Sequence, residues 1–99
     1  MQRFRIFLLA GLICIAGCGY GKVSPTTYEL AKALYNISNR KVSEKLVVAK
    51  QQIESAKEKN EITDQEAKWL KAILHRAEQG QWDKAMKSAR RIMEDQVVN

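Results

Sequence analysis

The sequence is poor in the residues that interrupt helices. It has one proline and five glycines, and four of those glycines lie within the first 21 of the 99 residues. From Lys22 onward only Pro25 and Gly80 remain. No segment sustains an alternation of polar and apolar residues, so no sheet is expected. This composition excludes a turn-rich β-sandwich and favours helices joined by short connections.

Residues that build catalytic or metal sites are also scarce. His75 is the only histidine, and a histidine without a second histidine, a cysteine or a carboxylate pair beside it cannot form a zinc site. There is no glycine-rich phosphate loop, nucleophile elbow or Cys/His pair. The carboxylate pairs Glu58/Glu61 and Glu94/Asp95 lack any pattern of burial that would raise a pKa. We therefore expect no enzymatic activity, cofactor, metal or small-molecule substrate.

Residues 1–18 have the pattern of a targeting segment. Arg3 and Arg5 precede the apolar run 6–15, which is shorter than the ~20 residues that a membrane-spanning helix needs. The run ends in Ile15-Ala16-Gly17-Cys18, which resembles the lipobox of bacterial lipoproteins. The resemblance implies a signal peptide over residues 1–17 and a lipid-modified Cys18. An ordinary signal peptide cleaved nearby and an uncleaved anchor are the alternatives.

The lipobox resemblance also implies a location. Cys14 would leave with the signal peptide and Cys18 would carry acyl chains, so the mature chain would form no disulfide. Several acyl chains on one cysteine anchor a protein firmly to a membrane, because each buried CH₂ group contributes ~0.8 kcal/mol. Gly19, in the position where an aspartate would retain the protein at the inner membrane, implies the outer membrane in an organism with two membranes. The expected location is the cell envelope.

The net charge is +6, and without Arg3 and Arg5 it is +4, from 15 basic and 11 acidic residues. The acidic residues are interspersed, which is typical of a solvated surface of mixed charge. One basic edge is expected on the last predicted helix, where Asp83, Glu94 and Asp95 partly cancel it. It consists of Lys84, Lys87, Arg90 and Arg91. This edge is a candidate site for an anionic polymer, and nucleic acid is not the expected partner.

Two amphipathic segments follow a tether over residues 18–24. The first helix is expected to begin at Ser24-Pro25, with serine as N-cap and proline in the first turn, and to end in the polar cluster 36–40. The second is expected from about Lys41 to Lys59. Its apolar seam is narrow, and Val47 and Val48 are expected to widen it.

Two more helices complete the predicted domain. Thr63-Asp64-Gln65-Glu66 is a capping box that starts the third helix, and Gly80 ends it because glycine adopts the left-handed conformation without strain. The fourth helix, over about 82–97, follows after so short a connection that it must run antiparallel to the third. The sequence thus predicts an all-α domain over residues 25–99, a small antiparallel bundle of about four helices.

The second half of the chain carries a family resemblance. Its residues are Lys41-Val42-Ser43, Ile62-Thr63, and Trp82-Asp83-Lys84-Ala85 followed by Arg90, Met93, Asp95 and Val97. From about Lys41 to Val97 the chain resembles the C-terminal helical domain of the steroid receptor RNA activator protein, which is related to a domain of the vesicle outer coat. The resemblance implies a bundle used for protein association. The family continues into one more apolar helix beyond the position of Asn99, which implies either a shorter bundle or a partner that supplies the helix.

A second resemblance competes with the first. The pattern Ala77-x-x-Gly80-x-Trp82-x-x-Ala85-x-x-x-Ala89 is similar to half of a tetratricopeptide hairpin. At least about three such repeats are needed for stability, and the sequence holds one, so this interpretation ranks second.

The favoured functional hypothesis is a non-enzymatic helical module, tethered to a membrane, that binds another envelope protein or itself. Trp69 lies beside the expected apolar stripe of the third helix, where it either covers the edge of the core or meets a partner. Two alternatives remain. One is a binder of an anionic polymer through the basic edge, and the other is an accessory or inhibitor subunit of an envelope enzyme.

Overall fold

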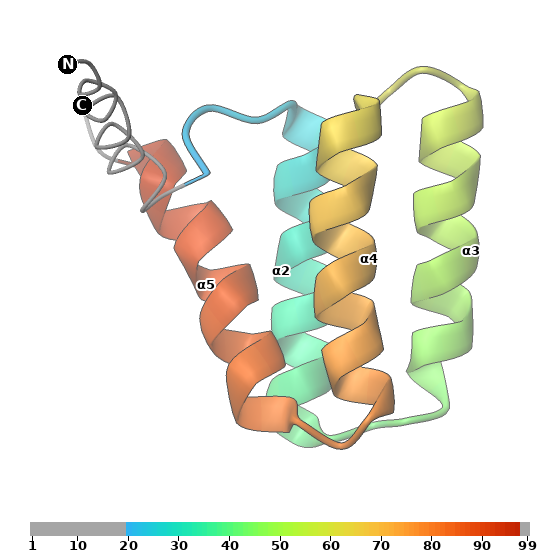
Figure 1. The fold of residues 1–99 in the computed structure, drawn as a ribbon, viewed down its shortest axis with the longest axis vertical. Coiled ribbons are helices and arrows are strands. Elements are labelled where there is room, and N and C mark those ends of the chain that lie inside the picture. The colour runs from blue at the N-terminus through green and yellow to red at the C-terminus, as the bar shows by residue number, and fades with distance from the viewer. Residues whose placement is uncertain (1–19, 98–99) are drawn as a thin grey trace, which may run out of the picture.

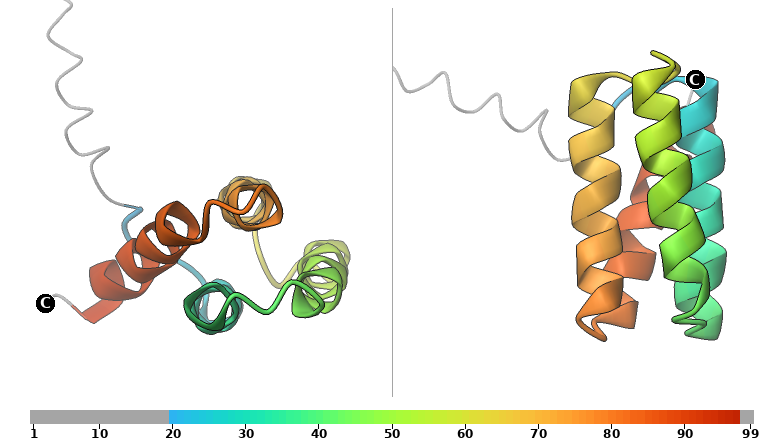
Figure 2. Two further views of the ribbon diagram at one scale, coloured as in Figure 1. Left: turned by 90° about the horizontal axis from the view of Figure 1, so that it is seen from below. Right: turned by 90° about the vertical axis from the view of Figure 1, so that its right-hand side faces the viewer.

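The computed structural model describes residues 20–97, which form four helices (Figure 1). These are α2 (Pro25–Arg40), α3 (Lys45–Glu58), α4 (Asp64–Glu78) and α5 (Trp82–Val97). Helices α2 and α4 form a central pair that pack on each other. Helices α3 and α5 lie on opposite sides of this pair, and each packs on both of its helices (Figure 2). The predicted all-α bundle is confirmed. The expected signal peptide and Cys18 lie outside the described residues.

The core is built from the apolar stripe of each helix. Its largest completely buried apolar side chains are Leu34, Ile53, Leu70, Ile73 and Ile92. Ala85 and Ala89 on α5 are also fully buried, and alanine lets a helix lie close to its neighbours because it has no side chain beyond Cβ. Every helix therefore contributes to one contiguous core.

The first three helices end in the same way. In each case the chain passes through a residue of positive φ, namely Lys41 (55°), Asn60 (60°) and Gly80 (80°). The N–H of the following residue then donates a hydrogen bond to the carbonyl five residues earlier, at distances of 2.9–3.1 Å. These are Schellman motifs, which supply partners for carbonyl groups that a helix end leaves unpaired. The expected stop at Gly80 is confirmed.

The expected start of the second helix at Lys41 was wrong. Lys41 takes the left-handed conformation that ends α2, and the N–H of Val42 donates to the carbonyl of Ile37 at 3.1 Å. Helix α3 begins only at Lys45. The stretch 41–43, which the family resemblance placed at the opening of a helix, is therefore the connection between α2 and α3.

The left-handed Lys41 leads to a prediction about stability. A residue with a Cβ is strained in this conformation by about 1 kcal/mol or more, whereas glycine is not, although glycine loses more chain entropy on folding. We expect Lys41→Gly to raise the free energy of unfolding by up to about 1 kcal/mol, measured by chemical denaturation. Ser43→Gly, in the same loop but without a positive φ, should instead destabilise slightly. Equal destabilisation by both variants would contradict the argument.

The core leads to a second stability prediction. Leu74 is 3% exposed, so Leu74→Ala should lower the free energy of unfolding by about 2–5 kcal/mol through lost burial and a residual cavity. Trp82 is only partly buried against the core. Trp82→Ala should therefore lower the free energy of unfolding by less than the removal of a fully buried tryptophan would. Thermal melts of both variants test this, and a Leu74→Ala protein that melts with the parent would refute it.

Candidate interaction surface

Residues 20–24, part of the predicted tether, run from the last turns of α5 to the start of α2 and are called the strap here (Figure 1). Asp95, near the end of α5, accepts the backbone N–H of Tyr20 at 2.5 Å. The side chain of Gln96 accepts the N–H of Val23 at 3.1 Å and donates to a strap carbonyl at 2.6 Å. The strap is thus held at both its N–H and its C=O groups by the last turns of α5.

The side chain of Tyr20 also fixes the strap. Its ring meets the ring of Trp69 on α4 edge to face, with centroids 4.9 Å apart and planes at 75°, an arrangement that aromatic quadrupoles favour. Trp69, expected either to cover the core edge or to meet a partner, is partly buried and contacts this tyrosine of its own chain. Tyr20 further borders a shallow hollow with Lys87, Ser88 and Arg91 of α5.

At the end of the strap, the carboxylate of Glu66 joins two helix starts. Thr63 and Glu66 form the predicted capping box, in which Thr63 Oγ1 accepts the N–H of Glu66 at 3.0 Å and Glu66 Oε1 accepts the N–H of Thr63 at 2.8 Å. Glu66 Oε2 also accepts the N–H of Ser24, the N-cap of α2, at 2.7 Å. One side chain therefore receives the N–H of both N-cap residues.

The surroundings of Glu66 favour its ionised form. Only 6% of the residue is exposed, and this burial raises the pKa of the carboxyl. The hydrogen bonds from Thr63, Ser24 and Thr27 lower it by more, so the pKa of Glu66 lies below its ordinary value of 4.5. The carboxylate is charged at neutral pH and is held there by donors from two helix starts.

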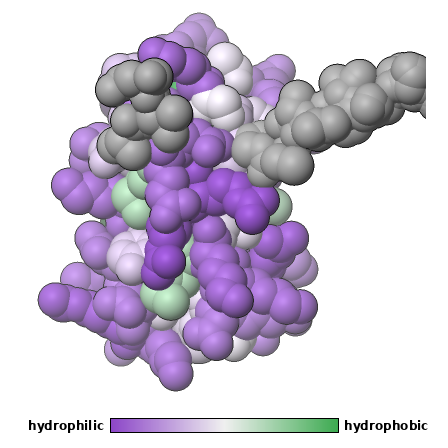
Figure 3. All heavy atoms as spheres, turned by 90° about the vertical axis from the view of Figure 1, so that its left-hand side faces the viewer, coloured by the Kyte–Doolittle hydropathy of each residue, from purple (hydrophilic) through white to green (hydrophobic). Residues whose placement is uncertain are grey.

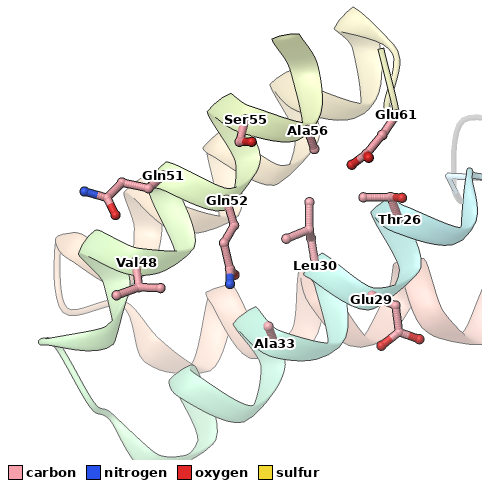
Figure 4. Close-up of a pocket in the computed structure, with 10 residues that line it drawn as sticks. All are labelled: Thr26, Glu29, Leu30, Ala33, Val48, Gln51, Gln52, Ser55, Ala56 and Glu61. Carbon is pink, nitrogen blue, oxygen red and sulfur yellow. The ribbon is translucent and has the colours of Figure 1, made fainter. Parts of the chain in front are cut away.

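On the opposite side of the bundle, an open groove runs between α2 and α3 (Figure 4). Two hollows, of about 540 and 380 Å³, share Ala33, Val48 and Gln52 and so form one continuous groove. Its apolar lining, which defines the α2/α3 groove, consists of Leu30, Ala33, Ile37, Val48, Ala49 and Ala56.

The exposure of two valines on α3 and the charges at the ends of the groove were not expected from the sequence. Val47 and Val48 were predicted to widen the buried seam of the second helix, but they are 62% and 51% exposed. The reason is that, among the four described helices, only α2 and α4 pack on α3, so its neighbours cannot cover a broad apolar face. Glu29 and Glu61 stand at one end of the groove, and Arg40 and Lys45 stand at the other.

The predicted basic edge of α5 is divided in the structure. The guanidinium of Arg90 lies 5.9 Å from the ring centroid of Tyr35 on α2, a cation–π contact. Lys87 and Arg91 instead line the hollow beside Tyr20, on the α4 side, and Lys84 lies near the start of α5. The structure therefore does not gather all four cations into one patch.

Other kinds of site are not visible in the described part of the chain. Across residues 20–97 no three His, Cys, Asp or Glu side chains come together as metal ligands, and His75 is exposed. Within the same residues no helix combines the length and the apolar character needed to cross a membrane.

Comparisons of the chain with protein families, with curated proteins and with solved structures give no match.

The carboxylate of Glu66 leads to a prediction about pH. A pKa that is lower in the folded chain than in the unfolded chain stabilises the fold above about pH 4.5, and this stabilisation is lost as the pH falls through the folded pKa. Glu66→Gln should lower the free energy of unfolding at pH 7 by about 1–3 kcal/mol and flatten its decline below pH 5.

The matched control is Glu54, whose pKa is also lowered, by its hydrogen bond with Lys71 across α3 and α4 at 2.8 Å. That pair is exposed to solvent, so Glu54→Gln should change stability little. Denaturation series between pH 3 and pH 7 test both variants. If both variants retain the acid profile of the parent, the role of Glu66 is refuted.

Proposed function

We propose that this chain is a membrane-anchored bacterial lipoprotein whose bundle is a non-enzymatic protein-interaction module. In this proposal Cys18 carries the lipid, in the outer membrane where the organism has two. The α2/α3 groove receives an amphipathic helix from another envelope protein or from a second copy of the chain. The observation that carries the proposal is the groove itself, which is open to solvent and lined by the exposed Val48.

The chemistry of the groove supports a helical occupant. Its apolar floor suits the side chains that an amphipathic helix presents at intervals of three and four residues. The acidic end, with Glu29 and Glu61, would attract the partially positive N-terminus of such a helix. The basic end, with Arg40 and Lys45, would attract its C-terminus. The charges therefore favour one direction of binding over the other.

A photo-crosslinking experiment in native membranes tests this proposal. A photoreactive residue replaces either Val48, which lines the groove, or Lys50, which is exposed on α3 but does not line it. We expect one stoichiometric crosslinked protein, from a partner or a second copy, at position 48 and none at 50. Ala33→Asp should weaken the crosslink because it places a charge in the apolar lining shared by the two hollows.

The lipid anchor is tested in the same cells. Labelled fatty acid should appear on the parent protein and be absent from Cys18→Ala. Equal crosslinking from positions 48 and 50 would contradict the role of the groove. Recovery of acidic polymer alone, released by salt, would contradict protein association and favour the polymer-binding alternative.

A further inference from the structure

We propose that the surface around Tyr20 lies against the membrane that holds the lipid anchor and binds anionic phospholipid headgroups there. This surface, the Tyr20 face, consists of Tyr20, Trp69, Lys84, Lys87 and Arg91. The inference rests on the proposed lipidation of Cys18, and it adds an orientation and a lipid class to the proposed function.

The first argument is the length of chain between the lipid and the bundle. Cys18 precedes Tyr20 by two residues, so their Cα atoms can be at most about 7 Å apart. Tyr20 is not the start of a loose linker, because its N–H is bonded to Asp95 and its ring rests on Trp69. A lipid on Cys18 therefore brings this part of the bundle close to the bilayer surface.

The second argument is the chemistry of the Tyr20 face. Tyrosine and tryptophan rings are enriched at membrane–water interfaces, where an apolar ring and a polar group can both be satisfied. Lys87 and Arg91 flank Tyr20 in one hollow, and Lys84 lies one turn before Lys87 on α5. Asp83, Glu94 and Asp95 offset part of this positive charge, and Asp95 is already bonded to the strap.

The third argument is the character of the surrounding surface. The side of the bundle formed by α5 is covered mainly by hydrophilic side chains, with only small apolar spots (Figure 3). Such a surface suits contact with charged headgroups and does not suit insertion among acyl chains. The α2/α3 groove lies on the opposite side of the bundle (Figure 2), so contact through the Tyr20 face leaves the groove open to a partner.

Fluorescence quenching of the acylated full-length protein in vesicles tests the orientation. Trp82→Phe leaves Trp69 as the single tryptophan, and lipids brominated near the headgroup quench only rings that reach them. We expect strong quenching of Trp69 in vesicles that contain phosphatidylglycerol. We expect weak quenching in phosphatidylcholine alone, or in 1 M salt, where the screening length falls to about 3 Å.

A charge reversal and its matched control identify the contact. The double variant Lys84→Glu/Lys87→Glu should lose most of the quenching, because each lysine near an anionic surface favours contact about fivefold. The control Lys32→Glu/Lys50→Glu makes the same change of charge at exposed positions on α2 and α3 and should retain the quenching of the parent.

The outcomes separate this inference from the proposed function. A protein that carries no lipid and does not float with vesicles would refute the lipoprotein proposal, and the orientation with it. A lipidated protein that floats would refute only the orientation if Trp69 is not quenched. The orientation alone is also refuted if the quenching does not depend on phosphatidylglycerol, or if the two double variants show equal quenching.

Discussion

The buried carboxylate of Glu66 is the interaction on which the arrangement of this small bundle depends. It accepts the N–H of Thr63 at the start of α4 and the N–H of Ser24 at the start of α2. These two helices form the central pair, and α3 and α5 are each packed against both. A charge with so little exposure is tolerated because donors surround it. The same donors fix the register of α2 against α4.

Much of the fold follows from local signals in the sequence. Ser24, the Thr63–Glu66 capping box and Gly80 mark helix ends through contacts within a few residues, and all three predictions agree with the structure. The misplaced start of α3 has a different origin. The polar cluster 36–40 marked the end of α2, but lysine has no preference for a positive φ. Nothing in the sequence therefore predicted that Lys41 would take the left-handed conformation and that a loop would precede α3.

The candidate surfaces were less accessible to sequence reasoning because they depend on distant residues. The strap meets Glu66 across 42 positions and Asp95 across 75, and no periodicity reports such pairs. The basic edge was predicted from helical spacing alone, which could not show that Arg90 turns to Tyr35 while Lys87 borders Tyr20. The exposure of Val48 depends on α3 having two packing neighbours, a fact of the tertiary arrangement.

The bond between Tyr20 and Asp95 also has a consequence for the order in which the molecule folds. The helix ends and short connections close through local contacts, which form early because little loop entropy opposes them. The strap is different, because its partners in α5 lie 75 and 73 positions away along the chain. Residues at the start of the bundle are thus among the last to reach their native position, and contact with the final turns of α5 completes folding.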